Sequence, residues 1–247
     1  MSRNHNGIIT TMVVLAILAA GSAGRAVTFT YINFEPPTYL PGDVNGQDSP
    51  AWVTFGAASN NVVNPITSLS GTVLDGTQSL EVFRTSTSGG GAYHPFSSPV
   101  STNYFQLSFK MQITGSDGHD DAYVGGLLKN TSQNPVFLRI NNGGVLSTTG
   151  SYTFNFGGSN LVTDRYAVTL SIDVVNQQYA VAATNLTHSG PALDWGIMPF
   201  AAPATAFSDV FVRSDGYKFL VDDLLVEIPE PGALWLFALG GLLLRRR

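Results

Sequence analysis

Residues 104–114 read YFQLSFKMQIT, and this stretch decides the fold that the sequence predicts. Apolar side chains occupy every second position from Phe105 to Ile113, and polar side chains stand between them. Alternate side chains of a strand point to opposite faces, so a period of two indicates an antiparallel strand with one buried and one solvated face. Residues 165–173, RYAVTLSID, alternate in the same way and predict a second strand of this kind.

Weaker runs with the same alternation lie on both sides of these two segments. Turn signals such as Asn45-Gly46 and Asp75-Gly76 separate the runs, and no amphipathic helical pattern interrupts them. About ten strands without helices between them predict an all-β fold, an antiparallel two-sheet β-sandwich of jelly-roll type. The domain is expected over residues 27–227. The further runs are residues 27–34, 51–55, 79–84, 122–128, 136–140, 152–156, 178–183, 209–213 and 219–227.

A rigid hinge and an apolar segment follow this domain. Pro229, Glu230 and Pro231 should be extended, because proline lacks a backbone N–H and disfavours helix in the residue before it. Residues 233–244, ALWLFALGGLLL, carry no polar side chain. As a helix they would span roughly 18 Å, which is less than the ~30 Å hydrocarbon core of a bilayer. We expect a short hydrophobic helix that engages the membrane, and docking against the domain is the alternative.

A basic cluster, Arg245, Arg246 and Arg247, comes after the apolar segment. Long arginine stems reach the interface and lengthen the effective span of a short helix. Positive charge beside a membrane segment stays on the cytoplasmic side. The cluster is therefore expected to stop transfer and to leave the preceding domain outside the cytoplasm.

The order of these three parts resembles the PEP-CTERM sorting signal of bacterial proteins. Pro229, Glu230 and Pro231 match the motif of that family, residues 233–244 match its transmembrane helix, and the three arginines match its basic cluster. The resemblance implies that residues 228–247 are a sorting segment. It also implies recognition by a membrane-embedded exosortase, cleavage near the motif, and delivery to the cell surface or the extracellular matrix.

The first 26 residues predict a secretory signal peptide. A polar start with Arg3 precedes the apolar residues 8–20, IITTMVVLAILAA, and small residues follow. Cleavage after Ala23 or after Ala26 fits this pattern, and Ala26 is favoured because a strand-like run begins at Val27. An uncleaved anchor is the alternative, although the apolar stretch is short for one. Both ends of the sequence thus predict export.

Charge and cysteine content exclude several functions. All seventeen acidic residues lie between Glu35 and Glu230, where only seven basic residues occur, so the net charge there is −10. Nucleic acid and anionic lipid need a basic face, so neither is expected as a partner. The sequence contains no cysteine, which excludes disulfides, thiol catalysis and cysteine metal sites.

The two ends of the expected domain carry a second resemblance. The domain opens with Ile32-Asn33-Phe34-Glu35 and closes with residues 219–224, FLVDDL. These segments resemble the edges of concanavalin A-like and galactose-binding-like jelly rolls. Both families include many carbohydrate-binding modules, so the resemblance implies a jelly roll and, more weakly, binding of polysaccharide.

Three aromatic residues are candidates for that binding. Trp52, Tyr93 and Trp195 fall in or beside expected loops, where flat rings could stack on the apolar faces of sugars. The alternative is that each tryptophan fills one end of the sandwich core, because tryptophan is highly buried on average.

Carboxylates suggest two candidate ion sites. Asp117, Asp120 and Asp121 lie within five residues and could supply oxygen ligands to Ca²⁺, although a solvated acidic turn is the favoured interpretation. Glu35 could also meet Asp222 or Asp223 around an ion if the first and last strands pair. No cofactor is expected otherwise.

Catalysis has little support in the sequence. No Gly-x-Ser-x-Gly or His-Glu-x-x-His motif occurs, and Glu81 is the only glutamate well inside the domain. A glycosidase would need two facing carboxylates. We therefore expect a non-catalytic surface or matrix protein that binds polysaccharide. The alternative is an extracellular polysaccharide-active enzyme of the concanavalin A-like class.

Overall fold

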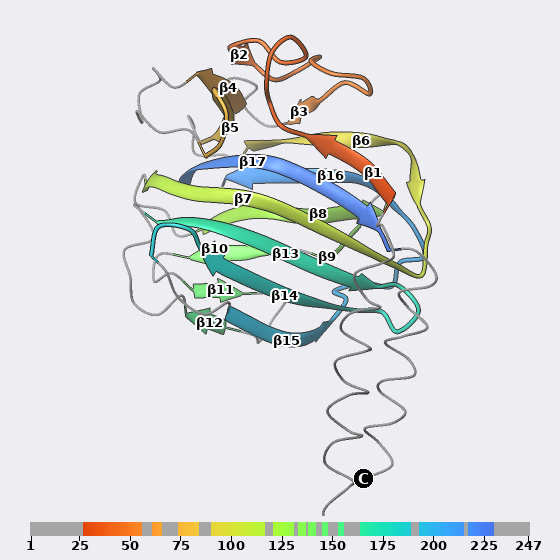
Figure 1. Ribbon diagram of the computed structural model, residues 1–247. Helices are drawn as coiled ribbons and strands as arrows, with labels where there is room; N and C mark the ends of the chain where they lie inside the picture. The colour runs from red at the N-terminus through yellow and green to blue at the C-terminus, as the bar shows by residue number, and fades with distance from the viewer. Residues whose placement is uncertain are drawn as a thin grey trace, which may run out of the picture. The chain divides into compact units, whose positions relative to one another are not determined.

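Two antiparallel sheets make up the part of the protein that the structure describes (Figure 1). The computed structural model describes residues 27–55, 61–65, 74–83, 90–116, 121–130, 133–136, 138–141, 145–147, 153–155, 164–188, 193–214 and 217–229. Residues Thr30–Val226 form one compact unit. The expected signal peptide, the apolar segment and the arginine cluster lie outside the described residues, as do Glu230 and Pro231 of the hinge. Within the described ranges, no helix is long and apolar enough to cross a membrane.

Sheet A is built around the longest alternating segments of the sequence. Its order is β15-β14-β13-β7-β17-β5-β4-β2, and β1 also pairs with β17. The strands are β1 (Val27–Ile32), β2 (Gly42–Asp43), β4 (Asn61–Pro65), β5 (Gln78–Val82), β7 (Tyr104–Ser116), β13 (Arg165–Asp173), β14 (Gln178–Asn185), β15 (Leu193–Pro199) and β17 (Tyr217–Ile228).

Sheet B packs behind sheet A in the view of Figure 1. Its order is β12-β11-β10-β8-β16-β6-β3, and β9 also pairs with β8. The strands are β3 (Val53–Phe55), β6 (Gly90–Val100), β8 (Asp121–Asn130), β9 (Gln133–Val136), β10 (Arg139–Asn141), β11 (Val145–Ser147), β12 (Thr153–Asn155) and β16 (Phe207–Ser214).

Alternation places the core between the two sheets. Leu107 on β7 lies opposite Leu170 on β13, which lies opposite Val181 on β14, and all three side chains are fully buried. Their neighbours along each strand face solvent. Each strand gains stability only by removing its apolar face from water, so this pattern selects the two-layer arrangement. The predicted all-β antiparallel sandwich is confirmed.

The last strand changes partners midway along its length. The first half of β17 pairs with β5, from Phe219 opposite Val82 to Val221 opposite Leu80, and β1 also pairs with β17 (Figure 1). Asp223 has φ +50°, the left-handed region that aspartate tolerates better than most residues. The chain therefore bends out of regular alternation close to the point where the pairing with β5 ends.

Candidate functional site

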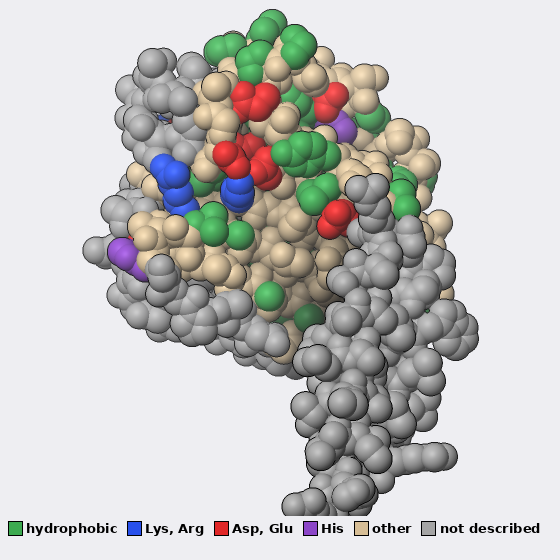
Figure 2. Space-filling model, viewed as in Figure 1, with side chains coloured by type: hydrophobic (Ala, Val, Ile, Leu, Met, Phe, Trp, Pro, Cys, Tyr) green, Lys and Arg blue, Asp and Glu red, His purple; other side chains and the backbone are tan. Residues whose placement is uncertain are grey.

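The solvent face of sheet A carries small and polar side chains on three neighbouring strands. The register places Gln106 opposite Ser171, and Ser108 opposite Thr169. On the other side of β13, Ser171 and Thr169 each lie opposite an alanine of β14. Gln106 Nε2 donates a hydrogen bond to Ser171 Oγ at 3.3 Å. All of these side chains are exposed or half-buried. Figure 2 shows this area as a surface without charged side chains. It offers hydroxyl and amide groups on a shallow, rigid support.

A hydrogen-bonded network borders this face. The Tyr31 hydroxyl donates to Asp223 Oδ1 at 2.7 Å, and Lys110 Nζ lies 2.8 Å from Asp223 Oδ2. Lys110 also forms an ion pair with Asp75, whose other oxygen accepts the Gly76 backbone N–H at 2.9 Å. We call Tyr31, Asp75, Lys110 and Asp223 the Tyr31 network. Its members come from β1, the turn before β5, β7 and β17, so only the folded sheet brings them together.

Ionisation within the Tyr31 network is shifted by these contacts. The hydrogen bond to Asp223, together with burial, raises the pKa of Tyr31 to about 12. The hydrogen bonds from Lys110 and Gly76 lower the pKa of Asp75. Burial alone would lower the pKa of Lys110, but its contacts with Asp223 and Asp75 outweigh burial and raise it. At neutral pH the Tyr31 phenol is therefore neutral, Lys110 is an ammonium and Asp75 is a carboxylate.

Asp222 lies directly beside this network but points away from solvent. Its side chain is 1% exposed, and it accepts the Ser79 hydroxyl at 2.9 Å and the Asp223 backbone N–H at 2.8 Å. Burial raises its pKa to about 7, because the charged form loses its hydration. Asp222 and Asp223 are adjacent in sequence but have opposite environments.

The Glu35 carboxylate contacts the turn before β5, and an ion shared with Asp222 or Asp223 stays a prediction. Its carboxylate accepts the backbone N–H of Thr77 at 2.6 Å and of Gln78 at 3.1 Å, and the Thr77 hydroxyl at 2.5 Å. Burial would raise the pKa of Glu35, but these hydrogen bonds outweigh it and lower the pKa. The Glu35 carboxylate also occupies the space that a Cβ atom at Gly76 would need, and φ at Gly76 is +57°. Glu35 therefore fastens the chain after β1 to the turn before β5.

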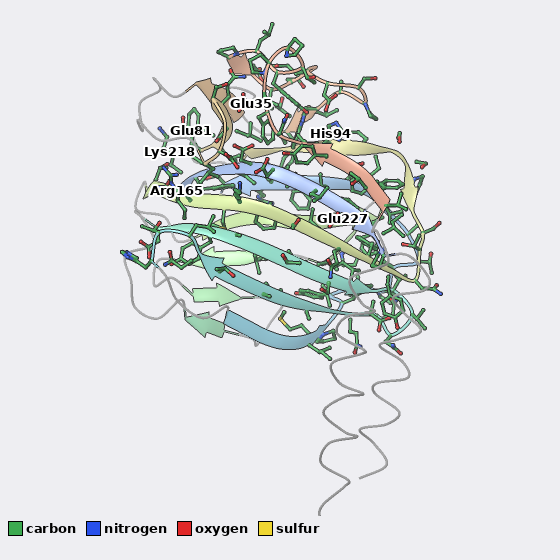
Figure 3. All side chains as sticks on the ribbon, in the orientation of Figure 1. Glu35, Glu81, His94, Arg165, Lys218 and Glu227 are labelled. Atoms are coloured by element: carbon green, nitrogen blue, oxygen red, sulfur yellow. The ribbon has the colours of Figure 1, made fainter. Side chains whose placement is uncertain are left out.

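A second acidic residue, Glu81, is also used inside the fold. It is 1% exposed on β5, and its carboxylate lies 2.8 Å from Lys218 Nζ on β17 (Figure 3). The Lys218 ammonium also lies 5.1 Å from the centre of the Phe83 ring. A buried carboxylate needs such a partner, because an isolated buried charge is very costly. Glu81 is thus a buried member of an ion pair.

Trp52 lies in the core, which corrects its expected place in a sugar-stacking surface. Its side chain is 1% exposed, and its ring centre lies 5.7 Å from that of Phe34 and 5.3 Å from that of His94. The indole N–H donates to the Tyr39 hydroxyl at 3.0 Å, and Tyr39 in turn donates to Asp48 at 2.5 Å. No ring face remains for a ligand.

The other two aromatic candidates lie on strands of different sheets. Tyr93 is half-buried on β6 of sheet B, where its ring centre lies 6.5 Å from that of Phe55. Trp195 belongs to β15 at the edge of sheet A, and its side chain lies outside the described residues. A stacking role for Tyr93 and Trp195 therefore stays a prediction.

The expected calcium loop lies outside the described residues for the most part. Asp117 and Asp120 are among the residues not described, and only the backbone of Asp121 is, at the start of β8. Calcium binding there stays a prediction. In the part of the chain that the structure describes, no group of three or more His, Asp or Glu side chains could hold a metal ion.

A histidine and a buried aspartate meet at one end of sheet A. Asp164 is 1% exposed, lies 3.2 Å from His188 Nε2, and accepts the Asn185 side-chain amide at 2.8 Å. The Thr187 hydroxyl accepts the Arg165 backbone N–H at 2.9 Å. These contacts join the start of β13 to the end of β14. They stabilise the two strand ends.

Comparison with solved structures agrees with this architecture. Lectin II from Ulex europaeus is similar over 81% of this chain and 99% of the lectin, with 11% identity and a TM-score of 0.52. Peanut lectin with a nine-residue peptide is similar over 83% of this chain and 99% of the lectin, with 10% identity and a TM-score of 0.51. At such low identity the likeness concerns the fold alone. No family model matches the chain, and no curated protein matches it.

The sequence contained a signal for part of the Tyr31 network. Lys110 stands between the buried residues Phe109 and Met111, so alternation alone assigns it to the solvent face. Tyr31 precedes buried Ile32 in the same way. Nothing local indicates that Tyr31 and Lys110 meet at Asp223, because the three residues lie far apart in the sequence.

Proposed function

We propose that this protein is an exported, non-catalytic surface or matrix protein whose β-sandwich binds polysaccharide. The observation that carries the proposal is the solvent face of sheet A. Its serine, threonine and glutamine side chains form ordered rows on paired strands, and the Tyr31 network borders them. Sugars are bound by such groups, since hydroxyls exchange hydrogen bonds with hydroxyl, amide and carboxylate side chains.

The similar solved structures support the same proposal, because both are lectins by name. The environment of the carboxylates supports a non-catalytic role. Glu81 is buried against Lys218, and Glu35 is occupied by three donors. Hydrolysis of a glycosidic bond needs two carboxyl groups that flank a bound substrate. Neither of these glutamates is free to take that part.

A glycan array tests the binding function. Purified protein is expected to bind one or more polysaccharides and to release no reducing sugar on prolonged incubation with them. Binding without turnover supports the proposal. Release of oligosaccharides would instead assign the protein to the polysaccharide-active enzymes, and absence of binding to every glycan would contradict the sugar-binding role.

The proposed route to the surface depends on the hinge after β17. Replacing Pro229, Glu230 and Pro231 by alanine together should remove the motif that an exosortase recognises. The precursor should then stay in the membrane fraction, and the mature form should be lost from the surface or medium. Immunoblots of cell fractions measure this. Replacing Val175, an exposed residue of the β13–β14 turn, is a control that should mature normally. Normal maturation of the triple variant would contradict the sorting proposal.

A further inference from the structure

We propose that Tyr31 is the stacking platform of a subsite for an uncharged pyranose, and that Asp223 supplies the hydrogen bonds that orient the sugar. This inference rests on the proposed sugar-binding function and assigns that function to particular atoms. The first observation is exposure. The Tyr31 side chain is 54% exposed, whereas Trp52 and Tyr39 are 1% exposed.

The orientation of the ring is the second observation. The Tyr31 hydroxyl donates to Asp223 Oδ1 at 2.7 Å, and Asp223 Oδ2 is held by Lys110 at 2.8 Å. An exposed tyrosine usually moves between rotamers, but a hydrogen bond at its tip restricts it. A ring that is already held loses little side-chain entropy when a ligand stacks on it. The network thus prepares an aromatic face beside a carboxylate.

The position of this ring is the third observation. Lys110 belongs both to the Tyr31 network and to the polar face, since it lies opposite Ala167 on β13 and two residues from Ser108. Strands lie about 4.8 Å apart, close to the length of one pyranose unit. A glycan that stacks on Tyr31 can therefore continue across β7 and β13 over Ser108 and Thr169.

Charge decides the class of sugar. The ammonium of Lys110 is engaged by two carboxylates, Asp75 and Asp223, so the three groups together carry a charge of about −1. The whole chain carries a formal charge of −5. A uronic acid would bring another carboxylate next to these two, and like charges in contact oppose binding. An uncharged hexose polymer fits the subsite better than a polyuronate.

Affinity electrophoresis with the full chain tests the subsite. The probes are the neutral polysaccharides laminarin, galactomannan and dextran, and the polyuronate alginate. We expect one of the neutral probes to bind more tightly than alginate. Tyr31→Ala should weaken that binding about tenfold, because it removes the ring. Tyr31→Phe should weaken it less, because it keeps the ring and loses only the hydrogen bond to Asp223 that holds it. Asp223→Asn should weaken binding as well, because it loosens both Tyr31 and Lys110.

Val175→Ala is the matched control, because Val175 is an apolar residue with 60% exposure in the turn between β13 and β14. It should bind as the parent protein does. Thermal melting of each variant checks that the fold is kept. If a neutral glycan binds and Tyr31→Ala binds it equally well, or if alginate binds most tightly, the subsite is wrong while sugar binding stands. If no probe and no arrayed glycan binds, both proposals fail.

Discussion

Replacing Trp52 by alanine is expected to lower the free energy of unfolding by about 3–5 kcal/mol. The reason is the position of the indole inside an aromatic cluster with Phe34, Tyr39 and His94. Removal of the ring leaves a cavity and takes away the donor to the Tyr39 hydroxyl. Phe34, Tyr39 and Trp52 are the buried aromatic residues of the segment between β1 and β3.

Urea unfolding followed by far-UV circular dichroism measures the loss. Trp52→Phe is the control, because phenylalanine keeps much of the volume and loses only the indole N–H. It should cost about 1–2 kcal/mol, in line with one lost hydrogen bond and a smaller cavity. A Trp52→Ala variant that is as stable as Trp52→Phe would show that the ring fills no core.

Asp222→Asn is expected to stabilise the protein at pH 8 and to change little at pH 4. Burial raises the pKa of Asp222 to about 7 from an ordinary value of 3.8. Between these values the folded state binds more protons than the unfolded state, so the contribution of Asp222 to stability falls as the pH rises. The loss amounts to about 4 kcal/mol once the pH is above both values, at about 1.4 kcal/mol for each pKa unit.

Asparagine removes the titration but keeps an oxygen that can accept the Asp223 backbone N–H. The melting temperature of the variant should therefore depend less on pH between about 4 and 7 than that of the parent. Asp75→Asn is a useful contrast, since hydrogen bonds from Lys110 and Gly76 lower the pKa of Asp75. The stability that Asp75 contributes is lost as the pH falls, so its pH dependence has the opposite sign to that of Asp222. Equal slopes for the parent and the Asp222→Asn variant would refute the assignment.

Much of the fold was predictable from local patterns. The alternation of residues 104–114 and 165–173 placed Leu107, Phe109, Val168 and Leu170 in the core, and the structure confirms these positions. Shorter strands such as β2 and β11 were not predicted, because two or three residues show no measurable period. Their pairing depends on neighbours that the local sequence does not reveal.

The candidate site was much less predictable. Trp52 and Tyr31 are both aromatic residues of the N-terminal third, yet one is 1% and the other 54% exposed. Local sequence does not separate these outcomes for Trp52, because its burial depends on Phe34 and Tyr39 of the loop after β1 and on His94 of β6. Asp222 and Asp223 also look alike in the sequence. The bend at Asp223 directs one carboxylate to Ser79 in the interior and the other to Lys110 at the surface.

The sequence alone therefore established an antiparallel sandwich without disulfides. It did so through side-chain periodicity, charge balance and the absence of cysteine, and these three features depend only on the order and type of residues. The folded sheets established which polar residues meet. Tyr31 and Asp223 are 192 residues apart along the chain, and their hydrogen bond forms because β1 and β17 pair. Strand pairing is a long-range choice governed by how the whole core is buried, so contacts of this kind become visible only in three dimensions.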